Sequence, residues 1–284
     1  MSLIRQLARP ATVWQALTVA YFILVFVILL APLAVVVISS VSAPVNDQVS
    51  TSYVPFPPQS LTLKWYQKIP QTQLDALWVS FTLGLAVAMS AIAIGVPAAL
   101  GLVRAQVAGK PLMAALLRAP LQIPHVVCGI AFLQMYYSLG DLTGLYLQGT
   151  VAGIYLGHLF LATPFVIGSV TAVLVRFNPR LEEAAQALGA SPWRTLRRVT
   201  LPVIAPGIFT GGLYAFIVSF VDVPVAIFLA SPAATTFPVE LFLAMEQDFE
   251  PTSLASASLA ALFAVILVAF AQKIVGLENL LRSR

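Results

Sequence analysis

The stretch RFNPRLEEAAQALGASPWRTLRRVTLPVIAP, from Arg176 to Pro206, is the only strongly charged internal segment of a chain that is otherwise almost entirely apolar. Its pattern predicts two short helices joined by a turn. Glu182 and Glu183 lie where a helix N-terminus favours negative charge, and Gly189 is placed to end that helix. Ser191 can cap the second helix. The result is a capped hairpin with a flat alanine face, which suits insertion into a groove on a partner protein.

The same charges are also typical of a solvated cytoplasmic loop that follows the positive-inside rule. The spacing of the motif favours a specific role. Glu183-Ala184-Ala185, then Gly189 after three residues, Val199, and Leu201-Pro202 resemble the signature loop of bacterial ABC importer permeases, which has isoleucine in place of Val199. The resemblance implies that the loop docks onto a separate ATPase subunit. The residues assigned to this coupling role are Glu182, Glu183, Ala184, Ala185, Leu188, Gly189, Leu201 and Pro202.

Composition places the chain in the membrane. Of its 284 residues, 60% are hydrophobic and only 9% are charged, whereas a soluble domain has about 25% charged residues. The net charge of +4 is too small and too scattered to indicate a nucleic-acid partner. The single cysteine, Cys128, excludes an internal disulfide and a cysteine-based metal cage.

Six membrane spans are predicted, since a span needs about 20 apolar residues. An amphipathic segment at 110–118 precedes the third span. The fold class expected is therefore an all-α polytopic membrane protein, which the resemblance identifies as a type I ABC importer permease. We expect a single domain over 1–284, with the coupling loop at 176–206 inside it. The predicted spans cover 14–38, 77–103, 121–139, 151–175, 204–229 and 254–274.

Lysine and arginine set the predicted orientation. With the N-terminus inside, only Lys64 and Lys68 of the 15 basic residues lie outside. Both termini and the hairpin are then cytoplasmic, in a bacterial inner membrane. The outer loop at 39–76 contains FPPQSLTLKWY, which predicts a short interfacial helix with Trp65 and Tyr66 in an aromatic belt. The outer loop at 231–253 is expected to contain a short helix around Val239–Met245.

Enzyme motifs are absent from the sequence. Lys110 follows Gly109, but Pro111 comes next and no glycine lies five residues before Gly109, so there is no Walker A loop. No HExxH or CxxC run indicates a metal site. The chain is therefore expected to be non-catalytic, with no cofactor of its own. The resemblance implies that ATP and Mg²⁺ are bound by partner ATPase subunits.

Asp222 is the most unusual residue of the predicted spans, since a carboxylate in the bilayer costs at least about 2.5 kcal/mol. It either lines a solute pathway and attracts a cation, or ends a helix near the outer interface. His158, in mid-span, is more typical of helix packing than of ligand binding. Tyr136 and Tyr137 either stack on an amine in an outer vestibule or belong to an aromatic belt. The predicted pathway set is Asp222, Ser219, Tyr136, Tyr137 and His158.

A second resemblance concerns the solute. Three motifs are similar to those of spermidine/putrescine-type permeases, and the likeness covers the chain from about Leu61 onward. Two departures weaken the match, because Val221 and Val223 flank Asp222 where a second acid is frequent, and His125 stands where an acid is common. Related branches for iron(III), phosphonate, thiamine or an oxyanion therefore stay open. The motifs are Pro120-Leu121-Gln122-Ile123-Pro124, Ser219-Phe220-x-Asp222 and Phe237-Pro238-Val239-Glu240.

The function expected from these observations is that of a permease subunit of a bacterial ABC importer for a polyamine or a similar small charged organic compound. Its expected partners are two ATPase subunits, a second permease that is a different but homologous chain, a periplasmic solute-binding protein and the lipid bilayer. One alternative is a stand-alone secondary transporter or channel in which Asp222 couples an ion. A membrane-bound enzyme is the other, but no paired carboxylates or metal-ligand cluster support it.

Overall fold

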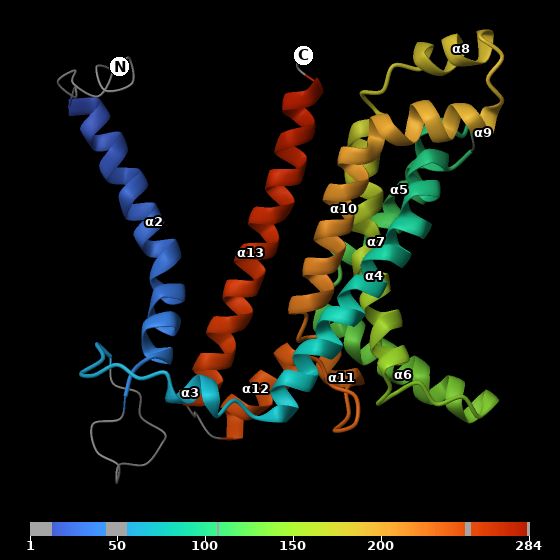
Figure 1. Ribbon diagram of the computed structural model, residues 1–284. Coiled ribbons are helices and arrows are strands. Elements are labelled where there is room, and N and C mark those ends of the chain that lie inside the picture. The colour runs from blue at the N-terminus through green and yellow to red at the C-terminus, as the bar shows by residue number, and fades with distance from the viewer. Residues whose placement is uncertain (1–12, 44–55, 107, 248–250, 283–284) are drawn as a thin grey trace. The chain divides into compact units, whose positions relative to one another are not determined.

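The structure is a computed structural model that describes residues 13–43, 56–106, 108–247 and 251–282 (Figure 1). The described residues are mostly helical and contain no strand beyond two isolated bridges. They form two compact units: unit 1 comprises Met1–Ile69 and Ala244–Val265, and unit 2 comprises Pro70–Leu243 and Ile266–Arg284. The helices are α2 (Val13–Ser40), α3 (Lys64–Gln67), α4 (Gln71–Arg104), α5 (Lys110–Arg118), η1 (Ala119–Leu121), α6 (His125–Thr143), α7 (Val151–Leu174), α8 (Arg180–Ala187), α9 (Pro192–Thr195), η2 (Leu196–Thr200), α10 (Leu201–Val221), α11 (Ala226–Leu229), α12 (Phe237–Gln247) and α13 (Pro251–Arg282).

The core of unit 2 is a bundle of α4, α7 and α10, each of which packs on the other two (Figure 1). Small residues let the three backbones approach closely, as in other membrane bundles. A Cβ placed on Gly211 of α10 would lie 2.8 Å from the Cα of Val166 in α7, and one on Gly95 of α4 would lie 2.9 Å from the Cβ of Val166. Val166 is itself fully buried. Glycine is therefore required where both neighbours face this valine.

The third predicted span is broken. α5 and η1 form one arm and α6 the other, with a bend of 96° between them. The amphipathic segment predicted at 110–118 is confirmed as α5. The long helix begins at His125 instead of residue 121, because Pro124 lacks an N–H and disfavours a helical conformation for Ile123. The break brings the first turn of α6 against α11.

The fifth predicted span, 204–229, is not one continuous helix, and the alternative that Asp222 ends a helix agrees with the structure. α10 stops at Val221, and Asp222 adopts an extended conformation with φ −68° and ψ 126°. Pro224 explains part of the break, since it disfavours a helical Val223. The Asp222 carboxylate explains the rest, because it accepts the first free N–H groups of the next short helix, α11.

Over the described residues, length and composition identify five of the six predicted spans, one of them as a bent pair. In the described part of the chain, four helical stretches are long and apolar enough to cross a membrane, and the bent pair of α5–η1 and α6 would be a fifth. The apolar stretch Pro251–Ile266 of α13 is shorter. The chain is thus an all-α polytopic membrane protein, and the sixth span stays a prediction.

The predicted short helix after Phe56 is confirmed as α3, and the predicted helix of the other outer loop is confirmed as α12.

In unit 1, polar side chains link α3 to the end of α2 and to α13. Trp65 does not lie in an exposed aromatic belt, because its ring is buried and its Nε1–H donates to the Ser42 carbonyl at 2.8 Å. The Tyr66 hydroxyl bonds with Ser40 Oγ and Ser258 Oγ, each at 2.7 Å.

Candidate functional site

The predicted hairpin begins with α8, and its C-terminal turn has the expected geometry. Gly189 lies at φ +86°, in the left-handed region that favours glycine. The Gly189 N–H donates to the Gln186 carbonyl at 2.9 Å, and the Ala190 N–H donates to the Ala185 carbonyl at 3.0 Å. This pair of bonds is a Schellman motif, which satisfies the last free carbonyls of α8. The prediction that Gly189 ends this helix is confirmed.

The second half of the hairpin differs from the prediction. Ser191 does cap α9, since its Oγ accepts the Arg194 N–H at 3.4 Å. However, α9 does not end as a separate short helix. Through the π-helical turn η2 it continues into α10, so that Pro192–Val221 is one helical run of 30 residues. Leu201 and Pro202 are therefore the first residues of α10 and not part of a loop.

Glu182 is used inside the fold. Its Oε1 accepts hydrogen bonds from Arg104 Nη2, at the end of α4, and from Thr200 Oγ1, in η2. These contacts tie α8 to two other elements and leave the Glu182 side chain only 20% exposed. The neighbouring Glu183 is exposed. Of the two predicted acidic coupling residues, only Glu183 therefore presents its carboxylate to the surface.

An apolar stripe runs along the exposed face of α8. Leu181, Ala184 and Leu188 follow the i, i+3, i+7 spacing that places side chains on one helix face. Such a stripe normally faces the core, yet Leu181 is 47% exposed and Leu188 is 90% exposed. Trp193, in α9, is 69% exposed. We name Leu181, Ala184, Leu188 and Trp193 the α8 surface; it lies at the end of unit 2 where α9 begins (Figure 1).

A second polar group of residues lies where α10 breaks. Asp222 Oδ2 accepts the backbone N–H groups of Val225 and Ala226, at 2.9 and 3.1 Å. Its Oδ1 lies 3.2 Å from His125 Nδ1, at the start of α6. The Asp222 side chain is only 2% exposed, whereas that of His125 is 39% exposed. The carboxylate is closed off by its own chain, and His125 forms the accessible edge of the group.

His158 completes this group from α7. Its Nδ1 lies 2.9 Å from Ser219 Oγ, and its Nε2 lies 3.6 Å from Asp222 Oδ2. The His158 side chain is fully buried. A buried carboxylate needs several polar partners to offset its desolvation, and here four groups surround it. The cluster of Asp222, His125, His158 and Ser219, which we name the Asp222 cluster, fastens α6, α7 and the α10–α11 break together.

Comparison with known proteins decides the family. Residues 91–276 match the family model described as "Binding-protein-dependent transport system inner membrane component". The chain belongs to this family. It is 31% identical over 199 residues to the "Putrescine transport system permease protein PotI" of Escherichia coli (strain K12), covering 69% of this chain and 71% of that protein. It is 30% identical over 221 residues to PhnV of Salmonella typhimurium (strain LT2), named for 2-aminoethylphosphonate transport, covering 78% and 79%.

The fold of the permease is also found among solved structures. A bacterial ABC transporter involved in the import of the acidic polysaccharide alginate contains a chain that matches with a TM-score of 0.71 and 14% identity, over 92% of this chain and 95% of that one. At this identity the likeness concerns the fold alone. Together with the family match, it makes this protein an ABC importer permease of the inner membrane, a class that works with an ATPase and a binding protein.

The two tyrosines of the predicted pathway set lie in different environments of the permease. Tyr136 is fully buried, and its hydroxyl donates to the Gly153 carbonyl of α7 at 2.8 Å. Tyr137 is exposed. Of the predicted set, the structure gathers Ser219, His158 and Asp222 into one cluster, and Tyr136 makes its bond elsewhere. His125 was not in that set, although its position directly after Pro124 marked it as the first residue of a helix.

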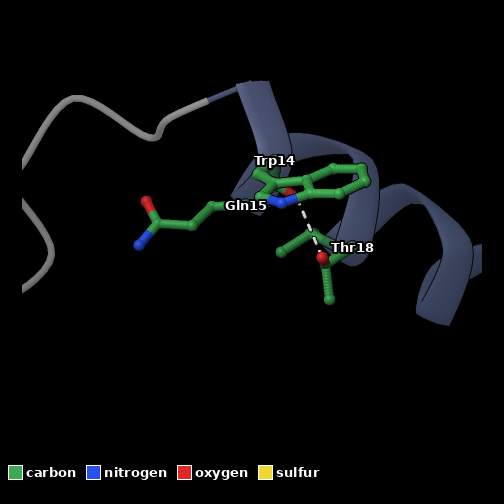
Figure 2. Close-up of a pocket in the computed structure, with 4 residues that line it drawn as sticks. Trp14, Gln15 and Thr18 are labelled. Carbon is green, nitrogen blue, oxygen red and sulfur yellow. Dashed lines mark hydrogen bonds between the residues drawn. The ribbon is translucent and has the colours of Figure 1, made fainter.

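Neither of two pockets in the described part of the chain is lined by convergent polar groups. The pocket in Figure 2 is lined by Trp14, Gln15, Thr18 and Val19, all from neighbouring turns of α2. Its drawn hydrogen bond runs from Thr18 Oγ1 to the Trp14 carbonyl at 2.8 Å, within the same helix. A second pocket, between α5–η1 and α7, is lined almost entirely by apolar side chains. In the described residues, no group of three or more His, Cys, Asp or Glu side chains is arranged to hold a metal ion.

Proposed function

We propose that this chain forms half of the solute pathway of an ATP-driven importer and has no catalytic activity of its own. The observation that carries the proposal is the α8 surface. The hairpin exposes leucines and a tryptophan to water. Burying this apolar surface against a partner would stabilise the complex by about 25 cal/mol for each Å² removed from water. A helix that presents an i, i+3, i+7 stripe is suited to a groove on another protein.

The partner of this surface is an ATPase subunit, as the signature spacing from Glu183 to Pro202 implies. Glu182 is committed to Arg104 and Thr200, so it holds the hairpin in place and does not contact the partner. Glu183, Ala184 and Leu188 supply the contact, together with Trp193. ATP and Mg²⁺ are bound by two such ATPase subunits. Their closure moves the hairpin, and through α10 it moves the pathway.

The proposed orientation of the chain in the membrane places the remaining partners. The N-terminus, the C-terminus and the hairpin are cytoplasmic, which leaves only Lys64 and Lys68 among the basic residues outside. This chain forms a single membrane domain. A second, homologous permease chain forms the other half of the pathway. A periplasmic binding protein delivers the solute to the outer loops. The bilayer is the remaining partner.

We propose that the solute carries a primary ammonium group on a short alkyl chain. Putrescine and 2-aminoethylphosphonate, the compounds in the names of the two relatives, differ in charge and in their second functional group. A primary ammonium is the feature that they share. This chemistry includes polyamines and excludes iron(III), thiamine and inorganic oxyanions.

The coupling proposal is tested by Leu188→Asp in the complete importer reconstituted in proteoliposomes. The side chain is 90% exposed, so its replacement leaves the fold intact. We expect solute-stimulated ATP hydrolysis and uptake to fall at least tenfold, because a carboxylate is driven into an apolar groove at a cost of about 2 kcal/mol or more. The matched control is Gln186→Ala, also exposed on α8 but off the stripe, which should keep full activity.

Retention of wild-type stimulated ATPase activity by Leu188→Asp would overturn the coupling role. The solute proposal has a separate test: binding of labelled putrescine, 2-aminoethylphosphonate and thiamine to the cognate binding protein. We expect the amines to compete with each other and thiamine to compete with neither. A binding protein that takes thiamine or an oxyanion and ignores both amines would overturn the solute class and leave the coupling role untouched.

A further inference from the structure

We infer that His125 contacts the ammonium group of the solute as it crosses the permease, and that Asp222 orients His125 for this contact without touching the solute. The inference rests on the proposed solute class. It assigns a pathway-lining residue that the signature motif does not contain. It also changes the role of Asp222 from a solute ligand to a positioning residue.

The position of the Asp222 cluster places it at membrane depth. His158 follows Val151, the first residue of α7, by seven positions, which is about 10 Å along a helix. The whole of α7 has 24 residues and spans about 36 Å, slightly more than a hydrocarbon core of about 30 Å. His158 and the Asp222 carboxylate beside it therefore lie within the thickness of the apolar layer.

The accessible edge of the cluster cannot face lipid. The side chain of His125 is 39% exposed while it is paired with a buried carboxylate. Polar groups at this depth face protein or a water-filled cavity, because contact with hydrocarbon is costly. The same holds for the irregular backbone at Pro124 and at Asp222, where two spans are broken side by side. In secondary transporters, breaks of this kind at membrane depth hold the substrate and the coupling ions.

The chemistry of the His125–Asp222 pair favours a solute group that can donate an N–H. His125 Nδ1 lies 3.2 Å from Asp222 Oδ1, and in the tautomer whose Nδ1–H donates to this oxygen, Nε2 is the hydrogen-bond acceptor of the ring. In this tautomer the ring presents an acceptor that has a carboxylate behind it. A primary ammonium offers N–H groups and a positive charge to such an acceptor. A quaternary ammonium of the same charge has no N–H to donate.

Asp222 itself is poorly placed to bind a solute. Its Oδ2 already accepts two backbone N–H groups, and His125 and His158 cover the rest of the carboxylate. A solute that reached it would have to displace a histidine and unpair α11. His125 needs no such rearrangement, because its exposed edge already lies at the surface of unit 2.

The histidine content of the chain gives a direct test on the wild-type importer. The chain has only two histidines, and His158 is fully buried. Of the two histidines, diethylpyrocarbonate should therefore modify His125 and spare His158, which peptide mass spectrometry of the assembled complex in nanodiscs can follow without the binding protein. We expect saturating putrescine to slow this modification about tenfold. Permethylated putrescine, which has the charges but no N–H groups, should not slow it.

A variant supplies the second arm. In the same nanodiscs, His125→Phe should weaken putrescine binding about tenfold, the loss expected for one charge-assisted hydrogen bond. It should also abolish the preference for putrescine over its permethylated analogue, a change that a merely structural defect would not produce. Gln122→Ala, exposed at the same helix break, is the matched control and should bind putrescine as the wild type does.

Three results would overturn the inference. Putrescine binding by the wild type without protection of His125 would reject His125 alone and leave the solute class standing. Loss of the partner permease from purified His125→Phe complexes would show that this edge is a subunit contact. If the wild type binds neither putrescine nor 2-aminoethylphosphonate, the proposed solute class fails together with the inference.

Discussion

The α8 surface and the Asp222 cluster lie near opposite ends of the helical run Pro192–Val221, and they expose different kinds of side chain. On α8 the apolar side chains are exposed and an acid, Glu182, is tied into the fold. At the break of α10 the acid, Asp222, is buried, and the exposed group is His125. In both places the carboxylate fastens separate elements together, and the neighbour in front of it is free for a partner. Glu182 and Asp222 therefore attach elements of the fold to one another, and their exposed neighbours are the better guides to binding.

The largest effect that could break this comparison is that of Asp222→Ala. The change leaves the N–H groups of Val225 and Ala226 without their acceptor and deprives the buried His158 of its charged neighbour. We expect a loss of about 3–5 kcal/mol in stability, as for other buried charge networks with one partner removed. Thermal unfolding of the purified permease in nanodiscs measures it. A melting temperature within a degree of the wild type would show that Asp222 fastens nothing.

A smaller effect on the same cluster is expected for Ser219→Ala. Ser219 Oγ is the hydrogen-bond partner of His158 Nδ1, and both groups are buried. An unpaired buried ring nitrogen costs about 1–3 kcal/mol. The same unfolding measurement should place Ser219→Ala between the wild type and Asp222→Ala. A destabilisation as large as that of Asp222→Ala would mean that His158, and not the carboxylate, is the centre of the cluster.

On the hairpin, Gly189→Ala tests whether its shape is set by the backbone. No atom lies within 4 Å of a Cβ placed at Gly189, so the cost comes from the φ of +86° alone. We expect a loss of about 1 kcal/mol, visible as faster hydrogen exchange in the last turn of α8. Gly189→Asn should cost less, because asparagine tolerates the left-handed region better. Equal exchange rates in the two variants would contradict a conformational origin.

The finest comparison is between the two adjacent acids of α8. Glu182→Ala removes the contacts with Arg104 and Thr200, which should cost about 1 kcal/mol or less because the pair is partly exposed. Glu183→Ala should leave stability unchanged and weaken binding to the ATPase. Hydrogen exchange in α8 measures the loss of stability in Glu182→Ala. Co-purification of the ATPase with the permease measures the weaker binding of Glu183→Ala. The reverse pattern would exchange the roles assigned to the two carboxylates.

Local patterns in the sequence predicted the hairpin well and the breaks in the spans poorly. The Gly189 turn, the Ser191 cap and the amphipathic segment at 110–118 depend on a few adjacent residues, and all three are confirmed. The predicted span 204–229 ran past Val221, whereas the alternative role of Asp222 as a paired helix-end residue is what the structure shows. The preference of Asp222 for capping α11 with two backbone N–H groups outweighed the hydropathy of its neighbours. Pro224 was a visible signal for this break.

Tertiary contacts were beyond the reach of a single sequence. Glu182 is separated from Arg104 by 78 positions, and His125 is separated from Asp222 by 97. Nothing in the local pattern distinguishes the bonded Glu182 from the exposed Glu183. The two histidines that contact Ser219 and Asp222, His158 and His125, became apparent only when α6, α7 and α10 were packed together.

The continuity of Pro192–Val221 has a mechanical consequence. A run of 30 residues measures about 45 Å, and no loop interrupts it between the capped Ser191 and the extended Asp222. Under the proposed coupling role, this run carries a displacement of the hairpin to Asp222, whose Oδ1 lies 3.2 Å from His125 Nδ1. The run is irregular at the π-helical turn Leu196–Thr200, where Thr200 is bonded to Glu182, and it contains Pro206, which has no N–H to donate within the helix. The bond to Glu182 stiffens the first of these two points.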